Sequence, residues 1–139
     1  MRSNARSLII AVLVALGILL SNSPVLADGY GVDFGAETDA GKDGGSVMCP
    51  FDEVCIAKME SLGLRVSMSV FRGNRRRAYV NLYGRDLSCC YFEAAADSIT
   101  IDPRLPLSRV PFFKGSRARG ALFIENERVG TLYLRFHYR

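Results

Sequence analysis

Apolar and polar residues alternate along the middle of the chain, and this period of two constrains the fold more than any other feature of the sequence. In segment 64–71 the apolar members are Leu64, Val66, Met68 and Val70, and in segment 77–83 they are Ala78, Val80 and Leu82. Successive side chains of a β-strand point to opposite faces, so each segment is predicted to be a strand with one buried face. The sequence Arg72-Gly73-Asn74-Arg75 between them is typical of a turn, which makes the pair a β-hairpin.

The rest of the chain adds further short strands and their connections. We expect a central strand over 87–93, a short strand over 98–102, and two C-terminal strands over 121–125 and 129–138 that flank a turn. Pro and Gly residues punctuate 103–120, which predicts a long loop. The segment 50–62 predicts a short helix that ends at Gly63. Together these segments predict a mainly β fold, a small antiparallel β-sandwich or barrel with one short helix, stapled by disulfides.

The first 27 residues have the three parts of a secretory signal. Arg2 and Arg6 supply the positive start, an uncharged apolar run from Ser7 to Leu20 follows, and Val25-Leu26-Ala27 offers a peptidase cleavage site. A membrane-spanning helix needs about 20 apolar residues, more than this run supplies. We therefore expect cleavage before Asp28, no transmembrane span afterwards, and a periplasmic or extracellular protein.

The segment 28–46 differs in composition from the chain that follows it. It is dense in Gly, and its five acidic residues (Asp28, Asp33, Glu37, Asp39, Asp43) face only Lys42. This composition predicts a flexible acidic leader that is dispensable for folding. Tyr30, Val32 and Phe34 alternate within it, so docking as an edge strand is the minor alternative. Residues 47–139 then form a single β-rich domain.

The four cysteines, Cys49, Cys55, Cys89 and Cys90, all follow the export signal. An even number in a small exported chain predicts two disulfides. Adjacent cysteines would close a strained ring, so we expect two cross-links between the pairs Cys49/Cys55 and Cys89/Cys90, with either connectivity open. Zinc sites use other spacings, and redox sites normally carry C-x-x-C, so neither metal binding nor redox activity is favoured.

The sequence contains few signs of catalysis. The only histidine, His137, is predicted to lie on the polar side of the last strand, where a solvent-facing role is the ordinary one. The sequence contains no nucleophile elbow, no zinc-binding H-E-x-x-H motif and no phosphate-binding loop. A triad is defined by geometry and not by sequence order, so a small hydrolase that uses His137 with a nearby carboxylate is the alternative function. No cofactor or metal is expected.

Basic and aromatic residues concentrate on the polar side of the first hairpin. The candidate ligand-binding residues there are Arg65, Arg72, Arg75, Arg76, Arg77, Tyr79 and Tyr83, and a second basic cluster comprises Lys114, Arg117 and Arg119. Arginine forks suit phosphates and carboxylates, and aromatic rings offer stacking surfaces. The plainer interpretation is an ordinary solvated strand surface and a loop whose phenylalanines cap the core.

These features predict an exported, non-catalytic binding protein of the cell envelope or exterior. An anionic envelope component or an acidic protein fits the arginines as a partner, whereas nucleic acid is improbable in that compartment.

Overall fold

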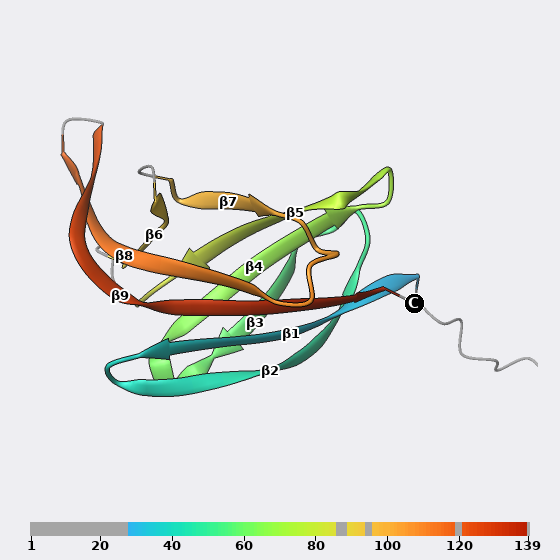
Figure 1. Cartoon of the computed structure of the whole chain (residues 1–139), viewed down its shortest axis with the longest axis horizontal. Coiled ribbons are helices and arrows are strands. Elements are labelled where there is room, and N and C mark those ends of the chain that lie inside the picture. The colour runs from blue at the N-terminus through green and yellow to red at the C-terminus, as the bar shows by residue number, and fades with distance from the viewer. Residues whose placement is uncertain (1–27, 86–88, 94–95, 119–120, 139) are drawn as a thin grey trace, which may run out of the picture.

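The computed structural model describes residues 28–85, 89–93, 96–118 and 121–138, so the segment predicted to be a signal peptide lies outside the described residues. The strands form two antiparallel sheets that face each other (Figure 1). One sheet has, in spatial order, β2 (Gly41–Pro50), β1 (Gly29–Thr38), β9 (Ala121–Tyr138), β8 (Ser108–Ala118) and β6 (Cys89–Tyr91). The other has β3 (Cys55–Met59), β4 (Leu64–Phe71), β5 (Asn74–Tyr83) and β7 (Ser98–Ile101). The predicted antiparallel β architecture is confirmed.

The core lies between the two sheets and consists of the inward-facing residues of both. Val66, Met68 and Val80 of the four-stranded sheet are almost wholly buried, as are Leu132 and Leu134 of β9. The hairpin predicted from the alternation is present as β4 and β5, and the short strand near Ile99 is present as β7. Among the described residues, no helix is long and apolar enough to cross a bilayer.

The expectation of a flexible leader over 28–46 is wrong, because these residues form most of the β1–β2 hairpin. β1 lies between β2 and β9, and its Tyr30, Val32 and Ala36 are buried in the core. The alternating apolar residues therefore outweigh the high glycine content. Two of the glycines have a packing role, since a Cβ at Gly29 or at Gly44 would lie 2.4 Å from a carbonyl oxygen of the neighbouring strand.

The predicted helix over 50–62 is also wrong. Its residues form β3 and a short 3-10 turn, η1 (Glu60–Leu62), which ends at Gly63 in the left-handed conformation. Cys55, Ala57 and Met59 are buried while the residues between them are exposed, which is the period of a strand. The side chains that suggested a helical face therefore alternate across a sheet.

The C-terminal half contains longer strands than the sequence predicted. Most of the expected loop over 103–120 is β8, and the two expected C-terminal strands are one continuous strand, β9. Pro111 lies within β8 opposite Thr131, at a point beyond the part of β8 that pairs with β6. Proline is tolerated at such a position because β8 has a paired neighbour on one side only there. The register breaks around Phe113, and β8 and β9 curve upward at the left of Figure 1.

The segment 87–93 was expected to be a central strand, and the structure corrects this expectation. Within the described residues it contributes β6, three residues long, which pairs with β8 at the edge of the five-stranded sheet. Its apolar character on both faces has a local cause, since Cys90 and Phe92 are buried in the core and Tyr91 is also covered.

The disulfides join Cys49 to Cys55 and Cys89 to Cys90, so the predicted cross-links between the two pairs are wrong. β2 and β3 lie at neighbouring edges of the two sheets, and the Cys49–Cys55 bond links them covalently. On the same side, the Asp43 carboxylate accepts hydrogen bonds from the N–H (2.9 Å) and the hydroxyl (2.7 Å) of Ser61. These bonds, the hydroxyl one foremost, lower the pKa of Asp43.

We expect the β1–β2 hairpin to be essential for folding. Substitution of a buried valine in β1 and of an exposed valine outside the hairpin tests this expectation. Val32 is 1 % exposed and Val54 is 68 % exposed. Val32→Ala should lower the free energy of unfolding by about 2–3 kcal/mol, and Val54→Ala by less than about 0.5 kcal/mol. Chemical denaturation of both variants measures the difference. Deletion of residues 28–46 should abolish cooperative unfolding, and a deletion variant with the parental melting temperature would contradict this assignment.

Candidate functional site

Exposed aromatic side chains gather on the outer surface of the four-stranded sheet. Phe71, Tyr79 and Tyr83 are 45 %, 38 % and 43 % exposed, and Ile56 on the neighbouring strand is 56 % exposed. Large apolar groups are usually covered, so a set of them on one face marks a surface that can bind a partner. We define the aromatic face as the outward residues Ile56, Arg65, Phe71, Arg77, Tyr79 and Tyr83.

Strand register determines which residues lie beside the large side chains of the aromatic face. Ser67 and Ser69 of β4 lie between the larger residues of β3 and β5, because Ser67 pairs with Ile56 and Ser69 pairs with Tyr79. The small hydroxyl side chains of Ser67 and Ser69 therefore lie beside the larger side chains of Ile56 and Tyr79. Phe71 and Tyr79 make an edge-to-face contact with ring centroids 5.8 Å apart, which fixes one end of the aromatic row.

Arg65 adds charge to the aromatic face. It pairs across the sheet with Tyr83, and its guanidinium carbon lies 5.4 Å from the centroid of that ring. This cation–π contact holds the side chain over the ring and leaves its charge at the surface. Among the described residues, no salt bridge involves Arg65 or Arg77. Four of the predicted binding residues, Arg65, Arg77, Tyr79 and Tyr83, are thus on one face.

The other arginines of the first hairpin are directed elsewhere. The register breaks between Val70 and Phe71, so Arg75, Arg76 and Arg77 form a bulge in β5. The Arg75 guanidinium lies 4.5 Å above the ring of Phe51, at the end of the sandwich.

Carboxylates that are distant in the sequence partly neutralise this turn. Arg72 lies 3.2 Å from Asp28 and 3.6 Å from Asp52, and Arg76 lies close enough to Asp102 to help lower its pKa. The expected concentration of unpaired charge at the hairpin turn is therefore reduced.

The second basic cluster does not form a free loop. Lys114 lies in β8 with its Nζ atom 3.3 Å from a carboxylate oxygen of Glu127 on β9. Arg117 is near the end of β8, and Arg119 lies outside the described residues. The structure thus brings Lys114 to a strand surface where its charge is already paired.

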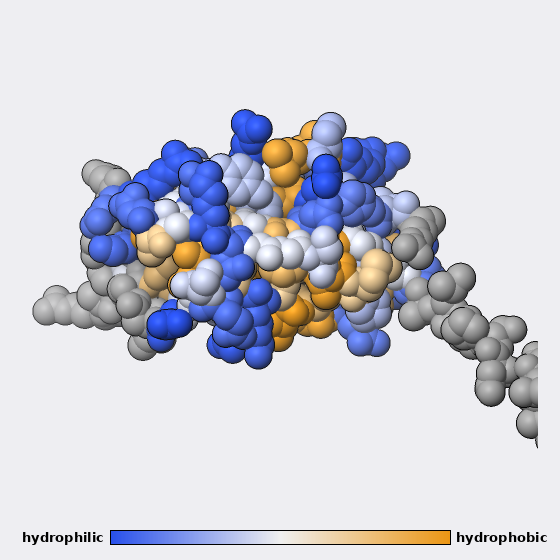
Figure 2. Space-filling view, turned by 90° about the horizontal axis from the view of Figure 1, so that it is seen from below, coloured by the Kyte–Doolittle hydropathy of each residue, from blue (hydrophilic) through white to orange (hydrophobic). Residues whose placement is uncertain are grey.

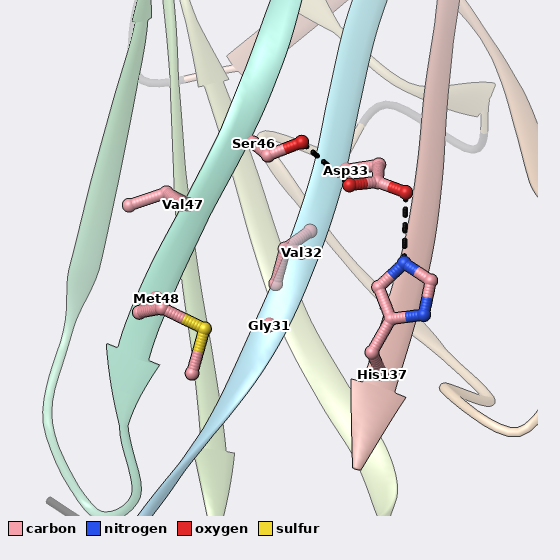
Figure 3. Close-up of a pocket in the computed structure, with 7 residues that line it drawn as sticks. All are labelled: Gly31, Val32, Asp33, Ser46, Val47, Met48 and His137. Carbon is pink, nitrogen blue, oxygen red and sulfur yellow. Dashed lines mark hydrogen bonds and ion pairs between the residues drawn. The ribbon is translucent and has the colours of Figure 1, made fainter. Parts of the chain in front are cut away.

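His137 belongs to a polar cluster on the outer surface of the other sheet (Figure 3). Its Nε2 atom lies 2.8 Å from Oδ2 of Asp33, and the Arg135 guanidinium donates to the same oxygen at 2.7 Å. The other oxygen, Oδ1, accepts a hydrogen bond of 2.6 Å from the hydroxyl of Ser46. The hydrogen bond from Ser46, followed by those from His137 and Arg135, holds the pKa of Asp33 well below its usual range.

This cluster borders a hollow of about 250 Å³. Gly31 lies directly between Met48 and His137 in the strand pairing, so the absence of a side chain at Gly31 leaves a gap between their side chains. Figure 3 shows Met48 and His137 on opposite sides of Gly31, with Asp33 and Ser46 at one end. From below, Figure 2 shows hydrophobic residues reaching the surface mainly toward the middle of the molecule.

The order of the hydrogen bonds does not match a catalytic triad. In a triad the imidazole accepts the proton of the serine, and the carboxylate lies behind the imidazole. Here the carboxylate of Asp33 lies between Ser46 and His137, and Ser46 donates to Asp33. A strongly ionised carboxylate that already accepts from Ser46, Arg135 and His137 is also a poor base.

Asp33 and Ser46 were missed because they fall in the segment interpreted as a flexible leader. The alternation of Tyr30 and Val32 with Gly31 and Asp33 is the signal that could have placed them on a strand. Nothing in the sequence alone pairs this strand with the one that carries Arg135.

We expect Ser46→Ala to raise the pKa of Asp33 toward its ordinary value, since the variant removes the largest of the interactions that lower it. A pH titration of the side-chain carboxyl carbon shifts by NMR measures this change. Asp102 is the internal control, because Arg104 lowers its pKa to about 2 far from Ser46. An unchanged Asp33 titration would show that the Ser46 hydroxyl does not bond to this carboxylate in solution.

Comparison with known proteins gives no relative. No family model, no curated protein and no solved structure matches this chain. The function is therefore argued from the two surfaces described above.

Proposed function

We propose that this chain is an exported, non-catalytic binding protein that binds an anionic glycan through the aromatic face. The observation that carries the proposal is the row of exposed aromatic rings along β4 and β5 with Arg65 stacked at one end. Pyranose rings present C–H groups that stack on the negative face of an aromatic ring. Carboxylate, sulfate or phosphate groups on the same polymer would accept hydrogen bonds from the arginines.

The spacing of the tyrosines favours a polymer over a single sugar. Tyr79 and Tyr83 are four residues apart on one face of β5, a separation of about 13 Å at the usual rise of a strand. A monosaccharide or a free phosphate cannot contact both rings. An extended chain lying along β5 could touch both rings and the hydroxyl group of Ser69 on the neighbouring strand.

Export is part of the proposal. The support comes from the signal-like residues 1–27 and from the two disulfides, which persist in oxidising compartments. Glycans with acidic groups are abundant partners in such compartments, whereas nucleic acid is not.

A hydrolase that uses His137 is the second candidate, and the short contact between His137 and Asp33 is the observation in its favour. With Nε2 engaged by Asp33, Nδ1 is the ring nitrogen left to accept a proton from a water molecule. The order of hydrogen bonds around Asp33 argues against it. Hydrolysis of a chromogenic ester or glycoside that disappears in His137→Ala would support this candidate over the binding protein.

We expect Tyr79→Ala/Tyr83→Ala to reduce retention on an immobilised acidic polysaccharide by about tenfold or more, because two stacked rings are lost. Arg65→Ser/Arg77→Ser should weaken retention mainly at low salt, since exposed charges are screened over about 8 Å at physiological ionic strength. Affinity electrophoresis in gels containing acidic or neutral polysaccharide measures both effects.

The matched controls change residues that are not part of the aromatic face. Arg104→Ser/Arg135→Ser makes the same change in net charge, and Tyr133→Ala removes a ring from the other sheet. These variants should be retained like the parent. Equal retention of the aromatic-face variants and the parent would overturn the proposal. Binding to anionic vesicles or to an acidic protein fraction, with none to the polysaccharide, would reject the glycan as partner.

A further inference from the structure

The two disulfides have different surroundings. Cys49 and Cys55 are 2 % and 7 % exposed, so both sulfur-bearing residues of this bridge are buried in the core. In the other bridge Cys90 is 3 % exposed, but Cys89 is only half-buried and lines a cavity. A thiol in solution can therefore approach Cys89 without unfolding of the core.

The two bridges also differ in what they constrain. The Cys49–Cys55 bond links the two sheets, and it closes a loop between residues six positions apart, which restricts the unfolded chain. Neighbouring residues such as Cys89 and Cys90 close no loop, so their bond removes little freedom from the unfolded chain. Stabilisation of the fold does not account for it.

The cavity beside Cys89 has a volume of about 390 Å³, and the three basic and two acidic residues in its lining leave it a net positive charge. It is lined by Leu62, Leu64 and Val129 and by the basic residues Arg85, Lys114 and Arg128, with Asp39 and Glu127 also present. Lys114 is the cross-strand partner of Cys89, and its charge is paired with Glu127, so the excess positive charge comes from Arg85 and Arg128 against Asp39. A thiolate that enters this cavity is therefore attracted toward the residue whose sulfur it would attack.

Gly84 leaves the sulfur open from the side of the cavity. Its N–H donates to the carbonyl oxygen of Cys89 (3.3 Å), which holds the two backbones together. A Cβ at position 84 would lie 3.4 Å from the Cys89 Sγ atom and 3.0 Å from its Cβ atom. Any side chain there would cover part of the disulfide, so the glycine keeps it accessible.

We propose that Cys89–Cys90 is a thiol–disulfide exchange site that accepts two electrons from a dithiol, with Cys89 as the attacked residue. A thiolate of the dithiol bonds to Sγ of Cys89, the bond between Cys89 and Cys90 breaks, and Cys90 leaves as a thiolate that takes up a proton. The second thiol of the dithiol loses its proton and attacks the other dithiol sulfur, which is bonded to Cys89 in the mixed disulfide. This step releases Cys89. The protein disulfide is reduced to two thiols and the dithiol is oxidised to a disulfide.

The experiment is reduction of the folded protein with dithiothreitol, followed by acid quenching, alkylation and peptide mass mapping. We expect Cys89–Cys90 to be reduced at least about tenfold faster than Cys49–Cys55, with the cooperative unfolding transition retained after selective reduction. Before reduction, the denatured protein should carry no free thiol. Equal rates for the two bridges, reduction only in denaturant, or free thiols at Cys89 and Cys90 would each overturn the proposal.

Charged monothiols test the role of the cavity. The ratio of the rate with 2-mercaptoethanesulfonate, an anion, to the rate with cysteamine, a cation, should fall about threefold in Arg85→Ser and in Lys114→Ser, and stay unchanged in Arg104→Ser. An unchanged ratio in both cavity variants would show that the thiolate does not approach through the cavity. Cys89→Ser/Cys90→Ser should abolish exchange and keep glycan retention, which separates this site from the aromatic face.

Discussion

The pairing of β1 with β9 is the constraint on which the rest of the structure depends. It places β1 between β2 and β9 in the five-stranded sheet and buries Tyr30 and Val32 against the opposite sheet. It also joins residues far apart in sequence, such as Asp33 and Arg135, whose positions differ by 102. Contacts of such long range require closure of most of the chain, so the five-stranded sheet can be completed only after the last strand has been synthesised.

The sequence predicted local elements well and long-range ones poorly. The β4–β5 hairpin was predictable because its alternating residues and its turn are neighbours in the chain. The hairpin over 29–50 was missed because glycines dilute the alternation, and their close approach to neighbouring carbonyl oxygens is visible only once the strands are paired. The strand β8 was missed because Pro111 suggested a loop, although Pro111 lies where β8 has a paired neighbour on one side only. The Cys49–Cys55 bond depends on β2 and β3 lying at neighbouring edges of the two sheets, which the spacing of the cysteines does not reveal.

The candidate site shows the same division. Alternation alone placed Tyr79, Tyr83 and Arg65 on the outer face of one sheet, and the structure has them there. The bulge in β5 redirects Arg75 onto Phe51, and a bulge depends on the register between two strands. Partners distant in the sequence decide which charges are neutralised, so a cluster of arginines in a sequence overstates the charge available to a ligand.

The contact between β2 and the segment that follows β3 also has a consequence for association between copies of the chain. β2 is the outermost strand of its sheet, and a long outermost strand is a template on which a second chain can add by backbone hydrogen bonds. The Asp43 carboxylate bound to Ser61 and the bond between Cys49 and Cys55 hold this strand against the other sheet at two points. Both anchors hinder strand addition along this edge, and only the second is sensitive to reductant, so conditions that reduce Cys49–Cys55 would also remove a safeguard against aggregation.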